Sequence, residues 1–127
     1  EEHHALLLPK LGAMIETPAA ALMAKDIAKH VDFLSFGTND LTQYTFAADR
    51  ENAAVEKYYD DASQAIFRLL KITHDDVPSV PLSLCGELAG RPEYIAKMLQ
   101  CGIRTLSIAG PLIPIVKETI RDCKVYA

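Results

Sequence analysis

Three residues whose side chains can do chemistry each follow a short apolar run: Glu16, Asp40 and Cys85. The runs occupy residues 11–15, 33–36 and 80–84, and each is followed by a stretch with helical character. This alternation predicts parallel β/α units, in which the carboxyl ends of the strands meet at one edge of the sheet. We therefore expect two carboxylates and a thiol to gather at that edge.

The elements that must position these residues alternate along the chain. Strands are predicted at residues 11–15, 32–37, 82–85 and 105–108, and helices at residues 17–30, 63–74, 92–102 and 113–123. A further helix follows Gly37, and a loop is expected over residues 45–61. Thr17 and Ser63 are predicted helix caps. Met23 and Ile27 are expected to face the sheet, and Val116, Ile120 and Cys123 are expected to share one apolar side of the last helix.

The length of the chain limits the fold to part of a barrel. A complete TIM-type (β/α)8 barrel needs about 250 residues, whereas this chain has 127. We interpret residues 1–127 as one partial barrel domain of the α/β class. The chain begins with Glu1 rather than methionine, and we expect it to belong to a longer polypeptide.

Composition and charge exclude several kinds of partner. A net charge of −4 without a basic cluster argues against binding to nucleic acid or to an anionic membrane. The apolar runs are too short to cross a bilayer and the first residues lack a signal-peptide pattern, so a cytoplasmic protein is expected. The cysteines are widely spaced, which favours free thiols, and Cys101 and Cys123 are expected to be buried.

Glu16 and Asp40 are the strongest candidates for a metal site. Two carboxylates at neighbouring strand ends form a hard oxygen site that suits Mg²⁺, which commonly leaves its other positions to water and substrate oxygens. The alternative is that each acid only stabilises the positive end of the helix that follows it. The sequence leaves both interpretations open.

Anion binding and acid catalysis are open hypotheses for other residues near the strand ends. Thr38 and Asn39 precede a helix and could hold an anionic group, and Arg50 could fold back to pair with phosphate. The alternatives are an ordinary turn and a surface arginine. Cys85 could act as an acid or a nucleophile, or could be a small buried side chain.

Glu87 and Arg91 flank the turn that follows Cys85. They are interpreted either as supporting residues of the site or as an exposed ion pair.

Four motifs carry a family resemblance: residues 12–18 (GAMIETP), residues 37–44 (GTNDLTQY), residues 47–50 (AADR) and residues 85–90 (CGELAG). In this order they resemble the C-terminal phosphoenolpyruvate-binding barrel of Enzyme I of the bacterial sugar phosphotransferase system, within the phosphoenolpyruvate-utilising enzymes. The resemblance implies the C-terminal half of a (β/α)8 barrel. It also implies that Glu16 and Asp40 bind Mg²⁺, that Asn39 and Arg50 hold the substrate phosphate, and that Cys85 protonates the enolate of pyruvate.

The partners implied by this resemblance are phosphoenolpyruvate or pyruvate, a histidine-carrying N-terminal domain and a small phosphocarrier protein. The last two lie outside these residues, so the isolated chain is expected to be inactive in phosphotransfer. Two other hypotheses stay open. One is a half-barrel that self-associates without catalysis, because open sheet edges favour a homo-oligomer. The other is a magnesium-dependent lyase or aldolase that acts on 2-oxo acids.

Overall fold

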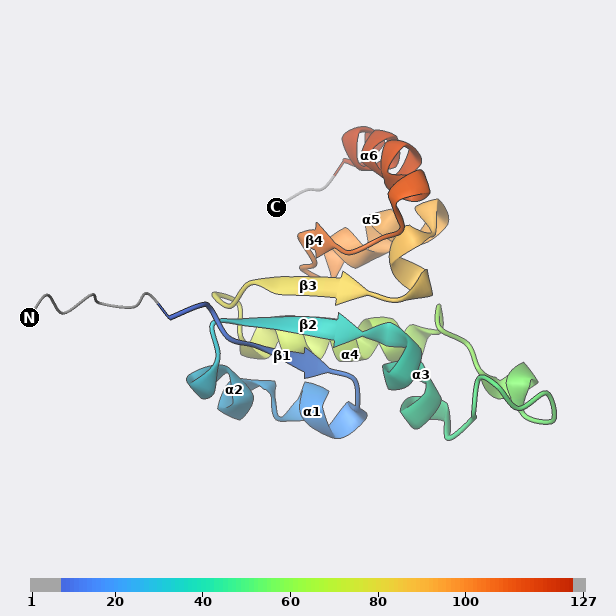
Figure 1. The fold of residues 1–127 in the computed structure, drawn as a ribbon, viewed down its shortest axis with the longest axis horizontal. Helices are drawn as coiled ribbons and strands as arrows, with labels where there is room; N and C mark the ends of the chain where they lie inside the picture. Colours follow the sequence, from blue (N-terminus) through green and yellow to red (C-terminus); the bar gives the residue numbers. More distant parts are fainter. Residues whose placement is uncertain (1–7, 125–127) are drawn as a thin grey trace, which may run out of the picture.

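The computed structural model describes residues 8–124, in which four parallel strands are connected by helices. Strand β1 (Gly12–Ile15) is followed by β2 (Phe33–Gly37), β3 (Leu82–Cys85) and β4 (Thr105–Leu106), and they lie in that order in the sheet. All neighbouring strands are parallel, as Figure 1 shows for β1, β2 and β3. The predicted α/β class is confirmed, whereas the ends of the predicted domain, residues 1–7 and 125–127, lie outside the described residues.

Helices and 3₁₀ turns form the connections. They are α1 (Pro18–Leu22), α2 (Ala24–Ile27) and η1 (Ala28–His30) after β1; α3 (Thr38–Phe46), η2 (Glu56–Tyr58) and α4 (Gln64–Asp76) after β2; η3 (Glu87–Gly90) and α5 (Pro92–Gln100) after β3; and η4 (Gly110–Leu112) and α6 (Ile113–Asp122) after β4. Both predicted caps are confirmed, since Thr17 accepts a hydrogen bond from the Ala20 amide and Ser63 from the Ile66 amide. Within residues 8–124 we find no helix with the length and apolar character needed to cross a membrane.

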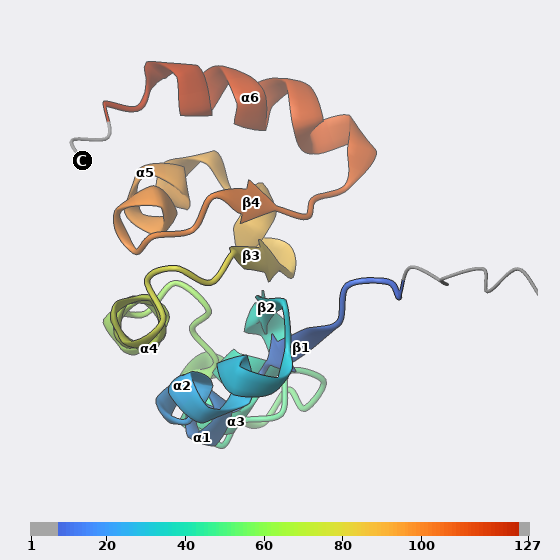
Figure 2. The same ribbon diagram turned by 90° about the vertical axis from the view of Figure 1, so that its left-hand side faces the viewer.

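The two faces of the sheet differ in how well they are covered. Strand pairing aligns Ile15, Phe36 and Leu84 in one row, and all three are fully buried. The adjacent row, Met14, Ser35, Ser83 and Thr105, lies on the opposite face and is partly or fully exposed. Figure 2 looks along the strands and shows α4 and α5 on the same side of the sheet. Cys85, two residues after Ser83, belongs to the more open face.

Amphipathic helices supply the other half of the core. Ile66 and Leu70 of α4 are fully buried, and Ile95 and Met98 of α5 are fully buried as well. These positions are three or four residues apart, so each helix turns one apolar face to the sheet.

The predicted helix over residues 17–30 is wrong as a continuous element. It is divided into α1, α2 and η1, and the backbone leaves helical geometry at Met23. Met23 is 51% exposed, whereas Ala21 and Ala24 are fully buried. The Ala21 carbonyl accepts a hydrogen bond from Thr73 Oγ1 of α4 at 3.2 Å, so α1 packs against α4 through small residues and through this bond.

Three further predictions about the elements are corrected. The loop expected over residues 45–61 is shorter, because α3 continues to Phe46 and η2 lies inside it. Strand β4 has two residues rather than four, since its pairing with β3 ends after the Ser107 amide donates to the Leu84 carbonyl. Ile120 is exposed although Val116 is buried, because α6 packs against α5 and lies outside the sheet layers (Figure 2).

Candidate functional site

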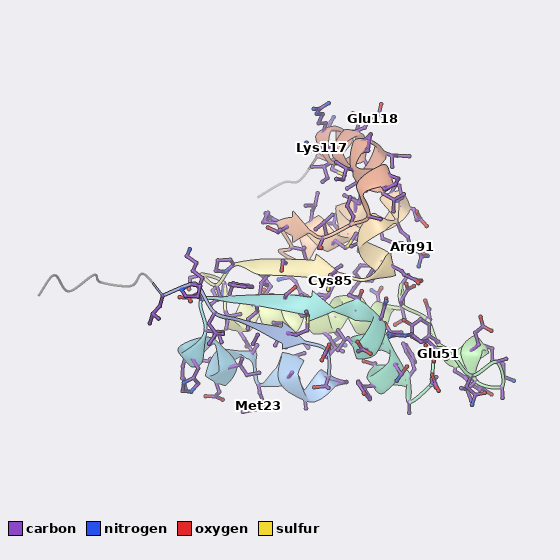
Figure 3. The ribbon with its side chains drawn as sticks, viewed as in Figure 1. Met23, Glu51, Cys85, Arg91, Lys117 and Glu118 are labelled. Atoms are coloured by element: carbon purple, nitrogen blue, oxygen red, sulfur yellow. The ribbon has the colours of Figure 1, made fainter. Side chains whose placement is uncertain are left out.

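The predicted site residues lie at the end of the sheet where β1, β2 and β3 finish. Glu16 directly follows β1, Asn39 and Asp40 are in the first turn of α3, and Cys85 is the last residue of β3. Figure 1 shows the arrowheads of these strands pointing toward the α3 end of the molecule. Figure 3 shows Cys85 near the tip of β3 and Arg91 beyond it. The expected gathering at one edge is confirmed.

Two hydrogen bonds join the end of β3 to the end of β2. Thr38 Oγ1 donates to the Cys85 carbonyl at 2.8 Å, and Cys85 Sγ donates to the Phe36 carbonyl at 3.3 Å. The Thr38 side chain is fully buried. It therefore supports the turn after Cys85, and its hydroxyl is not available to hold an anion as one hypothesis required.

Gly86 allows this turn to approach α3 closely. Its φ is +103°, and a Cβ at this position would overlap Thr38 Oγ1 and lie 2.9 Å from Asn39 Oδ1. Both the backbone conformation and the space require glycine. The two motifs that contain Asn39 and Cys85 are thus built to contact one another.

Asn39 is held by bonds from two different segments. Its Oδ1 accepts a hydrogen bond from the Glu87 amide at 3.2 Å, and its carbonyl accepts one from Tyr59 Oη at 3.2 Å. Because the side-chain oxygen is used in this way, the Asn39 NH₂ group is left to donate to a ligand. An amide fixed by its neighbours is suited to binding an anionic group.

A cleft of about 510 Å³ opens beside Cys85 and Asn39. Its walls come from the ends of β2, β3 and β4, and the lining residues are Asn39, Cys85, Gly86, Glu87, Gly90, Arg91, Ser107, Ile108, Ala109 and Leu112. Cys85 is partly exposed, and its Sγ is the donor in the hydrogen bond to the Phe36 carbonyl. A proton donor and an amide donor therefore share one cleft.

Arg50 folds back toward the start of α3 and contacts Asp40. Arg50 Nη1 lies 3.4 Å from Asp40 Oδ1, and the two side chains are 38% and 40% exposed. Arg50 also donates its backbone amide to Gln43 Oε1 at 3.4 Å. The guanidinium is thus near the start of α3 and remains accessible to an anion.

The Glu16 carboxylate extends toward the end of β2. A Cβ added to Gly37 would lie 3.0 Å from Glu16 Oε2, so the glycine makes room for this side chain. In the part of the chain that the structure describes, no group of three or more His, Cys, Asp and Glu side chains is placed to hold one metal ion. Glu16 and Asp40 would supply two carboxylates, a set that fits Mg²⁺ because this ion often takes water and substrate oxygens as its other ligands.

Asp61 is a site residue that no sequence pattern indicated. Its Oδ1 lies 2.5 Å from Arg91 Nη1, so Arg91 pairs with Asp61 and Glu93 rather than with Glu87. Burial acts to lower the pKa of Arg91, but the charge and hydrogen bond of Asp61 outweigh this effect and raise that pKa. Burial raises the pKa of Tyr59, and the Asp61 charge raises it further.

Cys101 and Cys123 take no part in the site. Cys101 is buried, as expected from the sequence, whereas Cys123 is only partly buried against the core. Burial raises the pKa of the Cys101 thiol, which makes it less reactive.

These features define a parallel α/β domain with a candidate anion and metal site at the carboxyl ends of its strands. Residues 5–125 match the family described as "PEP-utilising enzyme, PEP-binding domain", and the chain belongs to this family. PEP denotes phosphoenolpyruvate.

The names of similar proteins are consistent with this family. The chain is 42% identical over 114 residues to a "Phosphoenolpyruvate-protein phosphotransferase" of Buchnera aphidicola, with 88% of the chain and 20% of that protein covered. It is 40% identical to the Escherichia coli "Phosphoenolpyruvate-dependent phosphotransferase system" protein, with 89% of the chain and 15% of that protein covered. For a phosphotransferase of Haloferax volcanii the identity is 39%, and the shares are 91% and 21%. The chain therefore spans about a fifth of these relatives or less.

Proposed function

We propose that this chain contributes the phosphoenolpyruvate site of a phosphoenolpyruvate-protein phosphotransferase of the Enzyme I type. The observation that carries the proposal is the junction between the β2 and β3 ends, where the Glu87 amide binds Asn39 and both Asn39 and Cys85 line one cleft. The family match and the names of the relatives support the same assignment.

We assign phosphate binding to Asn39 and Arg50. The free NH₂ group of Asn39 and the accessible guanidinium of Arg50 are donors that suit phosphate oxygens. Arg50 must then exchange part of its contact with Asp40 for the substrate, which a 3.4 Å pair at the surface permits. Glu16 and Asp40 would hold Mg²⁺, which when bound supplies positive charge near the enolate oxygen.

Cys85 holds the proton that the reaction needs at carbon. When the phosphoryl group leaves phosphoenolpyruvate for a histidine, pyruvate remains as its enolate. The Cys85 thiol gives its proton to the methylene carbon, which yields pyruvate and leaves a thiolate. The partly exposed thiol on the open face of the sheet has the accessibility that this role requires.

The rest of the reaction requires groups outside these 127 residues. We propose that the four β/α units are the C-terminal half of a (β/α)8 barrel, because the strands are parallel and one face of the sheet is largely open. A histidine on a separate domain would accept the phosphoryl group and pass it to a small phosphocarrier protein. A cytoplasmic location is part of this proposal.

Self-association of the isolated chain is a second proposal. Strands β1 and β4 each have one side without a strand partner among the described residues, and exposed strand edges favour pairing between chains. Leu11 and Met14 at the β1 edge are exposed apolar side chains. Light scattering after gel filtration should show an oligomer, and a monomer at all concentrations would refute this proposal.

Calorimetric titration with phosphoenolpyruvate tests the proposed site. We expect saturable binding that requires Mg²⁺ and that weakens at least about tenfold in Asp40→Asn and in Arg50→Gln. Cys85→Ala should leave binding nearly unchanged, because the thiol is assigned to proton transfer. Equal binding without Mg²⁺, or in Asp40→Asn, would show that the assigned residues do not form the site.

Proton exchange of pyruvate in D₂O tests the role of Cys85 without a histidine domain. The NMR signal of the methyl group should fade in the presence of Mg²⁺ and persist in Cys85→Ala. Exchange that continues in Cys85→Ala would assign the proton to another group. A phosphotransfer assay with the carrier protein should show no turnover by the isolated chain.

A further inference from the structure

The long segment between α3 and α4, residues 47–62, carries Arg50 and Tyr59. It makes few hydrogen bonds or ion pairs to the remainder of the fold. Ala48 donates its amide to the Gln43 carbonyl, Arg50 contacts Asp40, and Tyr59 donates to the Asn39 carbonyl. All three of these contacts lead back to α3. They leave the end of the segment around Asp61 to be positioned by another contact.

Asp61 makes this contact, with Arg91. Among residues 8–124, its contact with Arg91 is the one hydrogen bond or ion pair that links residues 47–62 to the segment after β3. The Asp61 side chain is 12% exposed and Arg91 is 36% exposed. A carboxylate this far from water is costly unless it is paired, so removing Arg91 should cost more than breaking an ordinary surface ion pair.

Arg91 is itself held in place from several directions. Its guanidinium stacks over the Tyr94 ring at 4.5 Å, and its Nε lies 3.4 Å from Glu93 Oε1. Pro92 follows it and restricts its backbone to the extended conformation observed, with φ −98° and ψ 104°. Arg91 also lines the cleft with Asn39 and Cys85. Figure 3 shows Arg91 beyond the end of β3.

We propose that the Asp61–Arg91 ion pair is a clamp that fixes residues 47–62 against the turn after β3, and that Arg91 is a positioning residue for Arg50 and Tyr59. Without the clamp, the hydrogen bonds and ion pairs that hold residues 47–59 to the rest of the fold lead only to α3, and Arg50 is less well fixed beside Asp40. The effect on ligand binding rests on the proposed phosphoenolpyruvate site. The effect on the segment itself does not.

Amide hydrogen exchange of the full chain tests the clamp directly. We expect Asp61→Asn and Arg91→Gln each to speed exchange in residues 47–59 by about tenfold, with no comparable change in α4 or α5. Lys71→Gln, which breaks the exposed Lys71–Asp75 pair on α4, is the matched control and should leave the segment unchanged. Unchanged exchange in both clamp variants would overturn the proposal.

Two further variants distinguish a specific pair from general damage. The double change Asp61→Asn with Arg91→Gln should be no worse than either single change, because both remove the same contact. The charge-reversed pair, Asp61→Arg with Arg91→Asp, should restore slow exchange at least in part. Additive effects without rescue would mean that the residues act separately, and the clamp would be rejected.

Binding of phosphoenolpyruvate with Mg²⁺ gives the functional readout. Arg91→Gln should weaken binding several-fold and Lys71→Gln should not, since the Lys71–Asp75 pair on α4 lies outside the clamp. If the unmodified chain does not bind phosphoenolpyruvate but exchange still depends on Asp61 and Arg91, the proposed function fails and the clamp stands. If the unmodified chain binds it and Arg91→Gln binds equally well, the positioning role fails.

Discussion

The helix-covered face of the sheet and its carboxyl edge are held together by different forces. On the covered face, Ile15, Phe36 and Leu84 are fully buried among apolar side chains. At the edge, the contacts are polar: Thr38 with the Cys85 carbonyl, the Glu87 amide with Asn39, and Arg50 with Asp40. Apolar burial is strong but non-directional, whereas hydrogen bonds contribute less net free energy and fix atoms in place. The core should therefore govern stability, and the edge should govern the positions of functional atoms.

The largest loss of stability is expected from a cavity in the core. Leu70 of α4 is fully buried, and Leu70→Ala should lower the free energy of unfolding by about 2 to 5 kcal/mol. Urea denaturation gives this value. Leu69→Ala is the control, because Leu69 is only partly buried against the core and should cost less. Equal losses at the two positions would show that burial does not control stability here.

The next largest loss is expected at the junction of the two site motifs. Gly86→Ala forces a side chain into a left-handed conformation and against Thr38 and Asn39, which should cost about 1 to 3 kcal/mol. It should also shift the NMR signal of the Glu87 amide, because the bond to Asn39 is displaced. Gly110→Ala is a matched control, since a Cβ there would meet no atom within 4 Å. A signal for Glu87 that does not move would contradict the assigned junction.

Local patterns in the sequence predicted most of the elements correctly. The apolar runs before Gly37 and Cys85 became β2 and β3, and the caps at Thr17 and Ser63 formed as expected. The positions of Glu16, Asn39, Asp40 and Cys85 at strand ends followed from the same reasoning, because parallel strands bring their carboxyl ends together. Their roles in metal and phosphate binding remain predictions.

Features set by contacts between distant residues could not be predicted in this way. The break at Met23 accompanies a hydrogen bond from Thr73, 52 residues from its partner Ala21. Thr38 was a candidate anion ligand because it lies at the start of a helix. Its hydroxyl instead donates to the Cys85 carbonyl, 47 residues away, and no pattern in the local sequence indicates this contact. Asp61 and Arg91 are separated by 30 residues, and the sequence around each of them does not indicate that they form a pair.

A smaller effect on stability is expected for Tyr59. Its side chain is partly buried, less than the core residues. Its pKa is raised by burial and by the Asp61 charge, so the unfolded chain releases this proton at a lower pH than the folded chain. The stabilisation is fully present below the ordinary tyrosine pKa of about 10 and is lost as pH rises through the folded value. Ultraviolet titration should show one late-titrating tyrosine that Tyr59→Phe removes. Persistence of that late phase in the variant would assign it to another residue.

The smallest change in stability is expected for Arg50, although its effect on ligand binding should be large. Its contact with Asp40 is 3.4 Å long and both side chains are more than a third exposed, so Arg50→Gln should change the free energy of unfolding by less than about 1 kcal/mol. Arg50→Lys keeps the charge but lacks the planar fork that pairs with phosphate at two points, and it should recover only part of the binding. Denaturation and calorimetric titration on the same samples separate the two quantities. If Arg50→Gln destabilised the chain as much as Leu70→Ala, the division between a stabilising core and a positioning edge would be wrong.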